Sequence, residues 1–83
     1  MAPQVRQSRR FQRQCAKLPP DAQNAVWRAV RYFHQPRRTQ PLSGFPGLYE
    51  LRAGPWRIIW HYDEHGLIVL QSVDAHDRAL ARP

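Results

Sequence analysis

The stretch that decides the fold is Gly47-Leu48-Tyr49-Glu50-Leu51-Arg52, followed at once by Gly54-Pro55-Trp56-Arg57-Ile58-Ile59-Trp60. A third apolar stretch comes later, at Ile68-Val69-Leu70-Gln71-Ser72-Val73-Asp74. Alternating side chains rich in aromatic and β-branched residues predict strands over 48–52, 56–62 and 67–74. Short connections that contain glycine join these strands, so we expect an antiparallel meander.

Two helical patterns precede the meander. Phe11, Cys15 and Leu18 recur at helical spacing and predict a helix over 8–18. Pro19 and Pro20 end this helix and open a second one that runs to about residue 33. The apolar face of the second helix consists of Ala22, Val26, Ala29, Val30 and Phe33.

Helices followed by a meander define the α+β class. We expect a single domain spanning residues 1–83, with an N-terminal helical hairpin over about 8–34. The hairpin packs on a small, mainly antiparallel sheet of three to four strands over about 48–74. Residues 34–46, rich in turn-forming residues and prolines, read as the connector, and residues 1–7 form a short strand at most.

Composition narrows the class of protein. The 83 residues carry a net charge of +7, and a single cysteine, Cys15, excludes an internal disulfide. Cys15 fits a small apolar residue on a helix face better than a reactive thiol. No apolar run could span a membrane and the N-terminus lacks the apolar core of a secretory signal, so we expect a cytoplasmic protein.

The positive charge is concentrated in the first half of the chain. Residues 1–38 hold nine cations against one acid, whereas residues 39–83 hold four cations against five acids. This imbalance predicts an anionic partner, either nucleic acid or an acidic protein segment, although a solvated basic face is the simpler alternative. The candidate nucleic-acid-binding residues are Arg6, Arg9, Arg10, Arg13 and Lys17 along the first helix, Arg37 and Arg38 in the connector, and Arg52.

The sequence shows no metal-ligand spacing, no phosphate-binding glycine loop and no paired catalytic carboxylates, so we expect no metal and no cofactor. What remains is a set of arginines and histidines on a small sheet. RNA cleavage needs little more than these, because the 2′-hydroxyl can attack the adjacent phosphate. A base, an acid and a cation that stabilises the transition state complete the chemistry.

Four residues are candidates for this chemistry. Arg57 lies on the strand face opposite Trp56 and should point to an exposed sheet face, where it could clamp a phosphate, remain solvated or pair with Glu50. Glu50 could act as a base, orient Arg57 or form a surface ion pair. His76 follows the last strand and could donate or accept a proton, and Arg78 could join it.

The aromatic residues of the middle strand allow two interpretations. Trp56, Trp60 and Tyr62 could form a platform on which RNA bases stack. In a small domain such residues more often fill the core, because little else here is bulky enough.

The chain resembles the small toxins of the RelE/ParE superfamily. Four segments carry the resemblance: the two helices joined at Lys17-Leu18-Pro19-Pro20, Leu42-Ser43-Gly44, Gly-Leu-Tyr-Glu-Leu-Arg at 47–52, and Trp56-Arg57-Ile58-Ile59-Trp60. The phrase at 47–52 looks most like HigB-like members. The resemblance implies a toxin of a type II toxin–antitoxin pair that inhibits translation as a ribosome-dependent mRNA endonuclease, or mRNA interferase. It also implies three partners: a cognate antitoxin, the ribosome and mRNA.

The resemblance also implies roles for individual residues. Arg57 falls where RelE-like toxins keep an arginine that contacts the scissile phosphate, and His76 and Arg78 fall near basic positions after the last strand. Glu50 stands where RelE-like toxins use lysine, so two alternatives stay open. One is a ParE-like inhibitor of DNA gyrase that is not a nuclease, and the other is a non-catalytic nucleic-acid-binding module.

Overall fold

The computed structural model describes residues 5–31 and 39–75, which form two helices and five strands. The helices are α1 (Arg9–Ala16) and α2 (Pro20–Arg31). The strands are β1 (Val5–Gln7), β2 (Thr39–Pro41), β3 (Tyr49–Ala53), β4 (Trp56–Tyr62) and β5 (Ile68–Ala75). The predicted α+β class and the strand over 56–62 are confirmed, and the other predicted strands are each displaced by one residue.

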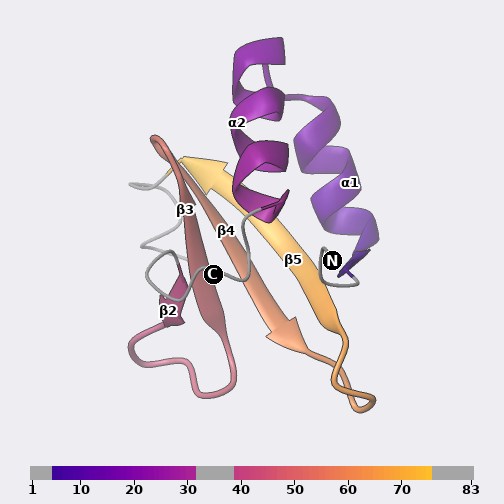
Figure 1. Cartoon of the computed structure of the whole chain (residues 1–83), viewed down its shortest axis with the longest axis vertical. Helices are drawn as coiled ribbons and strands as arrows, with labels where there is room; N and C mark the ends of the chain where they lie inside the picture. Colours follow the sequence, from indigo (N-terminus) through magenta and orange to yellow (C-terminus); the bar gives the residue numbers. More distant parts are fainter. Residues whose placement is uncertain (1–4, 32–38, 76–83) are drawn as a thin grey trace.

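The sheet is larger and more mixed than expected. Its five strands lie in the order β1-β5-β4-β3-β2, with β2 to β5 antiparallel and β1 parallel to β5. Figure 1 shows β4 between β5 and β3, with β2 at the far edge. The expectation of three to four strands was therefore wrong, because two three-residue strands extend the meander at its two edges.

Both added strands have three residues, which is too few for a periodic pattern to predict them. β2 lies within the predicted connector and ends in Pro41, a residue that a sheet tolerates at its edge because no partner needs the missing N–H. β1 pairs Val5 with Ile68 and Gln7 with Leu70, so the first described residues bind alongside the last strand.

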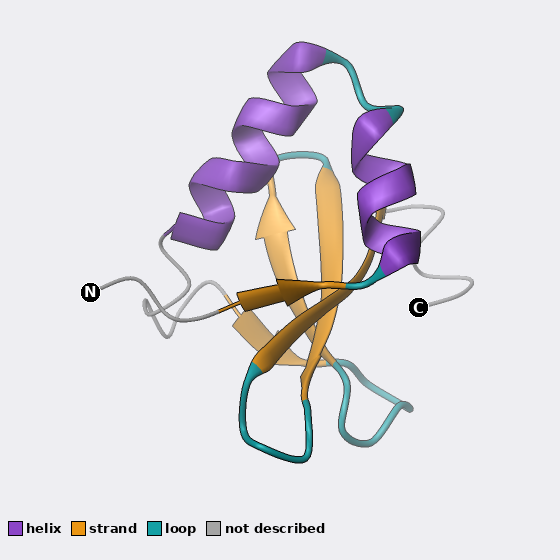
Figure 2. Cartoon of the chain, turned by 90° about the vertical axis from the view of Figure 1, so that its right-hand side faces the viewer, coloured by secondary structure: helices purple, strands orange, loops and turns teal. Residues whose placement is uncertain are grey.

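The two helices form the expected hairpin against one face of the sheet. Ser8 caps α1, since its hydroxyl accepts a hydrogen bond from the N–H of Phe11 at 3.0 Å. Figure 2 shows α1 and α2 diverging from their short connecting turn above the strands. The second helix is described as far as Arg31, and its predicted end at Phe33 lies outside the described residues.

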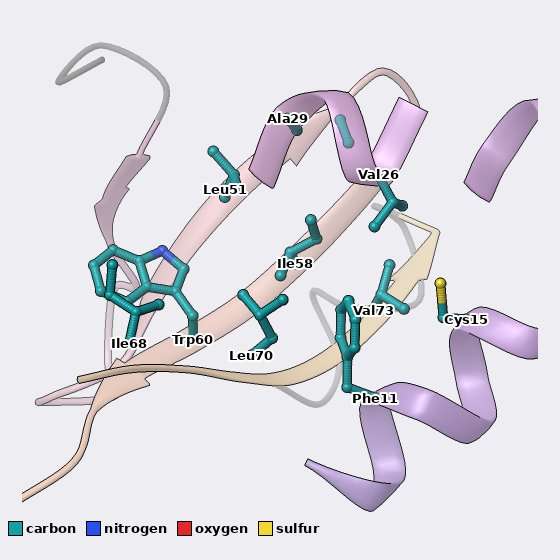
Figure 3. Close-up of a cluster of buried hydrophobic side chains, with 11 residues drawn as sticks. Phe11, Cys15, Val26, Ala29, Leu51, Ile58, Trp60, Ile68, Leu70 and Val73 are labelled. Atoms are coloured by element: carbon teal, nitrogen blue, oxygen red, sulfur yellow. The ribbon is translucent and has the colours of Figure 1, made fainter. Parts of the chain in front are cut away.

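The core lies between the hairpin and the sheet. Phe11 from α1 and Val26 from α2 are fully buried together with Leu51, Ile58 and Leu70 from the strands. Figure 3 shows the helix side chains pointing at those of the sheet. The apolar side chains of the helices, spaced at 3.6 residues, and those of the strands, at alternate positions, thus pack in one apolar layer.

The aromatic residues of β4 divide between the two interpretations. Trp60 is in the core, and its indole N–H donates a hydrogen bond to Thr39 Oγ1 at 2.9 Å. Trp56 is partly buried against the core, whereas Tyr62 is 53% exposed and packs edge-on to Trp60. The prediction that these aromatics fill the core is confirmed for Trp60 and in part for Trp56. Tyr62 lies at the margin of the core.

Two side chains of the α1 region form hydrogen bonds with the backbone of β5. The sheet has a bulge at Gln71, because Ile59 pairs with Ser72 and Trp60 with Leu70. The Ser8 hydroxyl donates to the Gln71 carbonyl at 2.7 Å, and Gln14 Oε1 accepts from the N–H of Val73 at 2.8 Å. These contacts satisfy backbone groups of β5 beyond its pairing with β1, which fixes α1 on this strand.

Neither described helix is long and apolar enough to cross a membrane.

Candidate functional site

The face of the sheet opposite the helices carries the charged candidates and is nevertheless buried at its centre. Alternation along β4 turns Arg57 and Ile59 away from the helices, and only 3% of Arg57 and 1% of Ile59 is exposed. Glu50, on the neighbouring strand, is 5% exposed. The strand pattern therefore identified the correct face, but the expectation that Arg57 is exposed was wrong.

Glu50 and Arg57 form a buried ion pair. The Nη1 atom of Arg57 lies 3.0 Å from Glu50 Oε2, with the side chains 4% and 7% exposed. Gln40, directly opposite Glu50 on β2, donates from its Nε2 to Glu50 Oε1. Each oxygen of the Glu50 carboxylate therefore has a donor. Gln40 fixes the carboxylate, and the carboxylate in turn fixes the guanidinium group of Arg57.

Of the three alternatives for Glu50, the geometry fits orientation of Arg57 best. The predicted ion pair is present, but its placement at the surface was wrong, because both side chains are buried. Surface pairs are worth little, whereas the loss of one partner from a buried pair leaves an uncompensated charge. This difference makes Glu50 important for the position and charge balance of Arg57.

The strand β2 that carries Gln40 is itself fixed by Thr39. The Thr39 hydroxyl accepts the indole N–H of Trp60 and donates to the backbone carbonyl of Glu50 at 3.0 Å. These bonds lock β2 in register against β3, so that Gln40 comes to lie beside the Glu50 carboxylate. The edge strand β2, which was not predicted from the sequence, therefore orients the buried carboxylate of Glu50 through Gln40.

A row of charged residues crosses the sheet next to this network. Arg52 on β3 is directly opposite Arg57 on β4, which is in turn opposite Asp74 on β5. Arg52 is exposed, unlike Arg57. Paired positions of neighbouring strands hold their Cβ atoms roughly 5 Å apart, so two guanidinium groups and two carboxylates share one patch of the sheet.

A hollow with a volume of about 450 Å³ opens on this patch. Glu50, Arg52 and Arg57 line it from the sheet, and Gln40 and Phe45 line it from β2 and the following loop. The hollow thus joins two cations, one acid and an aromatic ring. Such a lining suits an anionic ligand that also carries a flat apolar group.

The basic residues predicted to bind nucleic acid do not converge on the hollow. Arg9, Arg10, Arg13 and Lys17 are exposed on and just after α1, which covers the opposite face of the sheet. They form a separate basic surface, and among the described members of the predicted set only Arg52 lines the hollow.

Arg6 lies on β1 rather than along the first helix. It forms an ion pair with Asp63 at 3.3 Å in the turn between β4 and β5. Hydrogen bonds from the backbone N–H of Leu67, then from that of His65, together with Arg6, hold the pKa of Asp63 below its ordinary value. The pairing of Arg6 fits a structural role better than the nucleic-acid contact expected from its charge.

Four predicted residues, Arg37, Arg38, His76 and Arg78, lie outside the described residues. The last strand is described through Ala75, one position before His76 in the sequence. Within residues 5–31 and 39–75, no group of histidine, cysteine or acidic side chains could hold a metal ion. Cys15 is buried among the core residues, and burial raises the pKa of its thiol.

Solved structures define the fold. No protein-family model matches the chain, and no curated protein matches it in sequence. A chain of the toxin–antitoxin complex RelBE2 from Mycobacterium tuberculosis superposes with a TM-score of 0.74 at 24% identity, over 92% of this chain and 100% of that one. A chain of the RelB–RelE complex from Methanococcus jannaschii gives a TM-score of 0.73 at 13% identity, over 95% and 100%.

A third match identifies which subunit is similar. A chain from the complex of a mutant Escherichia coli toxin RelE with an antitoxin peptide matches with a TM-score of 0.64 at 21% identity, over 100% of this chain and 99% of that one. A peptide could not cover a whole 83-residue chain, so the match is to the toxin. The protein thus has an α+β fold found in toxin–antitoxin complexes. More particularly, it has the fold of the toxin RelE, so the fold that the sequence resemblance implied is confirmed.

Two residues of the hollow were not singled out in the sequence. Gln40 lies in a segment read as connector, and its only signal is its place opposite Glu50 once β2 is known. Phe45 stands between Gly44 and Pro46, and a large apolar residue among turn formers was the available hint.

Proposed function

We propose that the protein is the toxin of a type II toxin–antitoxin pair and acts as a ribosome-dependent mRNA endonuclease. The observation that carries the proposal is the buried Arg57–Glu50 pair at the hollow, next to the exposed Arg52, on the sheet face left open by the helices. Two arginines beside each other suit a phosphodiester, since guanidinium groups bind its oxygens through paired hydrogen bonds.

The proposed reaction breaks one bond and needs no metal. The 2′-hydroxyl of a nucleotide loses its proton to a base and attacks the adjacent phosphorus. The bond to the 5′-oxygen breaks, and an acid protonates that oxygen, which leaves a 2′,3′-cyclic phosphate and a 5′-hydroxyl. A fixed cation stabilises the charge that develops on the phosphate oxygens.

In this proposal Arg57 and Arg52 bind the scissile phosphate. Glu50 holds the Arg57 guanidinium in place, and Gln40 holds Glu50, so both are positioning residues. His76 serves as the acid or base, and Arg78 assists it. Both follow β5 in the sequence, and β5 carries Asp74 opposite Arg57.

The basic surface of α1 supplies the contacts with larger partners. Arg9, Arg10, Arg13 and Lys17 would grip ribosomal RNA, as would Arg37 and Arg38 in the chain segment that follows α2. This binding should weaken steeply as salt concentration rises. The cognate antitoxin would be an acidic segment that covers the basic surface or the hollow, and the protein would act in the cytoplasm.

Cleavage in a translation extract tests the proposal. Wild type, Arg52→Ala, His76→Ala and Arg6→Ala are added to an extract that translates one defined message, and the new 5′ ends of the message are mapped. We expect ends that appear only when the message is translated and that are lost with Arg52→Ala and His76→Ala. Arg6→Ala is the matched control, because Arg6 lies on β1 and pairs with Asp63.

The same proteins are assayed for inhibition of supercoiling by DNA gyrase. Inhibited gyrase with intact message would replace the nuclease by a ParE-like inhibitor. Salt-sensitive RNA binding with neither activity would leave a binding module and overturn the proposal.

A further inference from the structure

The loop between β2 and β3 carries an exposed aromatic residue, Phe45, on a hydrogen-bonded backbone. Its backbone is tied by three hydrogen bonds: Phe45 N–H to the Leu42 carbonyl at 3.2 Å, Leu48 N–H to the Phe45 carbonyl at 3.1 Å, and Leu42 N–H to the Leu48 carbonyl at 2.9 Å. The first two bonds close successive four-residue turns that meet at Phe45.

Both turns have the residues that their geometry demands. Gly44 has a φ of +83° and Gly47 a φ of +84°, each at the third position of its turn, and Pro46 occupies the second position of the second turn. This is the type II pattern, in which glycine accepts the positive φ and proline presets the preceding residue. A loop built in this way is ordered before any ligand arrives.

The ordered loop presents Phe45 at the rim of the hollow. Phe45 is 41% exposed, although a phenyl ring gains from burial, and it lines the same hollow as Arg52 and Arg57. An aromatic residue and arginines that line one hollow are the two features that single-stranded nucleic-acid sites combine, for the base and for the backbone.

We infer that the hollow binds one unpaired nucleotide of RNA, with its base stacked on Phe45 and its phosphate at Arg52 and Arg57. The inference rests on the proposed function, since it describes how that site would take its substrate. It adds Phe45 as a residue that recognises an unpaired base. Because the loop backbone is already hydrogen-bonded, binding needs little ordering of the backbone at Phe45.

Equilibrium binding separates the base contact from the phosphate contact. The probes are a short single-stranded RNA with 2′-O-methyl riboses, which cannot be cleaved through the 2′-oxygen, and an abasic oligomer of the same length and charge. The variants are Phe45→Leu, which removes the ring, Phe45→Tyr, which keeps it, and Tyr62→Leu. Tyr62 is the matched control because it is also an exposed aromatic but does not line the hollow.

We expect Phe45→Leu to weaken binding of the base-bearing RNA about tenfold, as loss of one stacked base does. Its affinity for the abasic oligomer should stay within about twofold, and Phe45→Tyr and Tyr62→Leu should bind both probes as wild type does. The urea midpoint of each variant is measured in parallel to establish that it is folded.

Three results would overturn the inference. Equal losses for both probes would make Phe45 a residue that only shapes the loop. Unchanged RNA binding by Phe45→Leu would remove the stacking contact, and loss of antitoxin binding alone would assign the ring to a protein partner.

The inference and the proposed function can fail separately. Phe45-dependent binding without cleavage of translated message would retain the nucleotide site and reject the nuclease. Cleavage that needs Arg52 but not Phe45 would retain the nuclease and reject the stacking of a base on Phe45.

Discussion

Replacing Glu50 by glutamine should destabilise the protein far more than its conservative shape suggests. The amide keeps the size of the side chain and can still accept a hydrogen bond from Arg57, but it leaves the guanidinium charge buried without its carboxylate. At the observed 3.0 Å, the Coulomb attraction between unit charges is about 5–6 kcal/mol at an effective dielectric constant near 20. Asp74, opposite Arg57 on β5, offsets part of this loss, so we expect a cost of about 3 kcal/mol.

A loss of this size is large for such a small domain. At roughly 0.05–0.15 kcal/mol per residue, 83 residues give a total stability of about 4–12 kcal/mol. Urea unfolding followed by tryptophan fluorescence is a suitable assay, because Trp60 is buried. With an m-value of about 1 kcal/mol per molar urea, Glu50→Gln should lower the midpoint by about 3 M.

Two further variants test the reason for the effect. Arg6→Gln breaks an ion pair whose arginine is 66% exposed, and it should cost no more than about 1 kcal/mol. Glu50→Gln combined with Arg57→Met removes both buried charges and should recover most of the lost stability. If Glu50→Gln costs less than Arg6→Gln, or if the double variant is no more stable than Glu50→Gln, the buried charge of Arg57 does not control stability and the reasoning is wrong.

Three other substitutions have defined outcomes. Ser8→Ala should lower the free energy of unfolding by about 1–2 kcal/mol, because it removes both the helix cap and the donor to the bulge carbonyl of Gln71, and no change in urea midpoint would contradict this. Gly47→Ala should cost about 1 kcal/mol, since its Cβ meets no atom within 4 Å and the penalty comes from the φ of +84° alone; an unchanged midpoint would mean that the turn adapts. Asp63→Asn should be less stable than wild type near neutral pH, because the lowered pKa of Asp63 means that its carboxylate form favours the folded state. That advantage is lost as the pH falls through the folded pKa, below 3.8, so the difference in midpoint should shrink in acid, and a difference independent of pH would refute the assignment.

The sequence predicted the parts of the fold that have long, regular patterns. The alternation at 56–62 located β4, and the spacing of Phe11, Cys15 and Val26 located the helix faces that are buried. β1 was allowed only as a short strand within residues 1–7 and β2 was not predicted, because three residues give no period.

The candidate site was predicted in part for a related reason. Alternation shows that Glu50 and Arg57 turn away from the core, but it does not show whether the second face of the sheet is solvated. Here that face is buried around Arg57, and the edge strand β2 brings Gln40 to the carboxylate. Phe45 lay beyond any periodicity argument, because its position depends on two turns and on the hollow that they border.

The position of β5 between β1 and β4 also limits when the protein can fold during its own synthesis. α1 packs chiefly on β5, and β1 pairs with it, yet more than fifty residues of chain separate them. Until residues 68–75 emerge from the ribosome, the apolar stripe of Phe11 and Cys15 has no sheet strand to cover, and such long-range pairing makes folding slow. The growing polypeptide therefore lacks its complete native sheet, and its α1 stripe stays open to capture by another protein, until its final described strand is made.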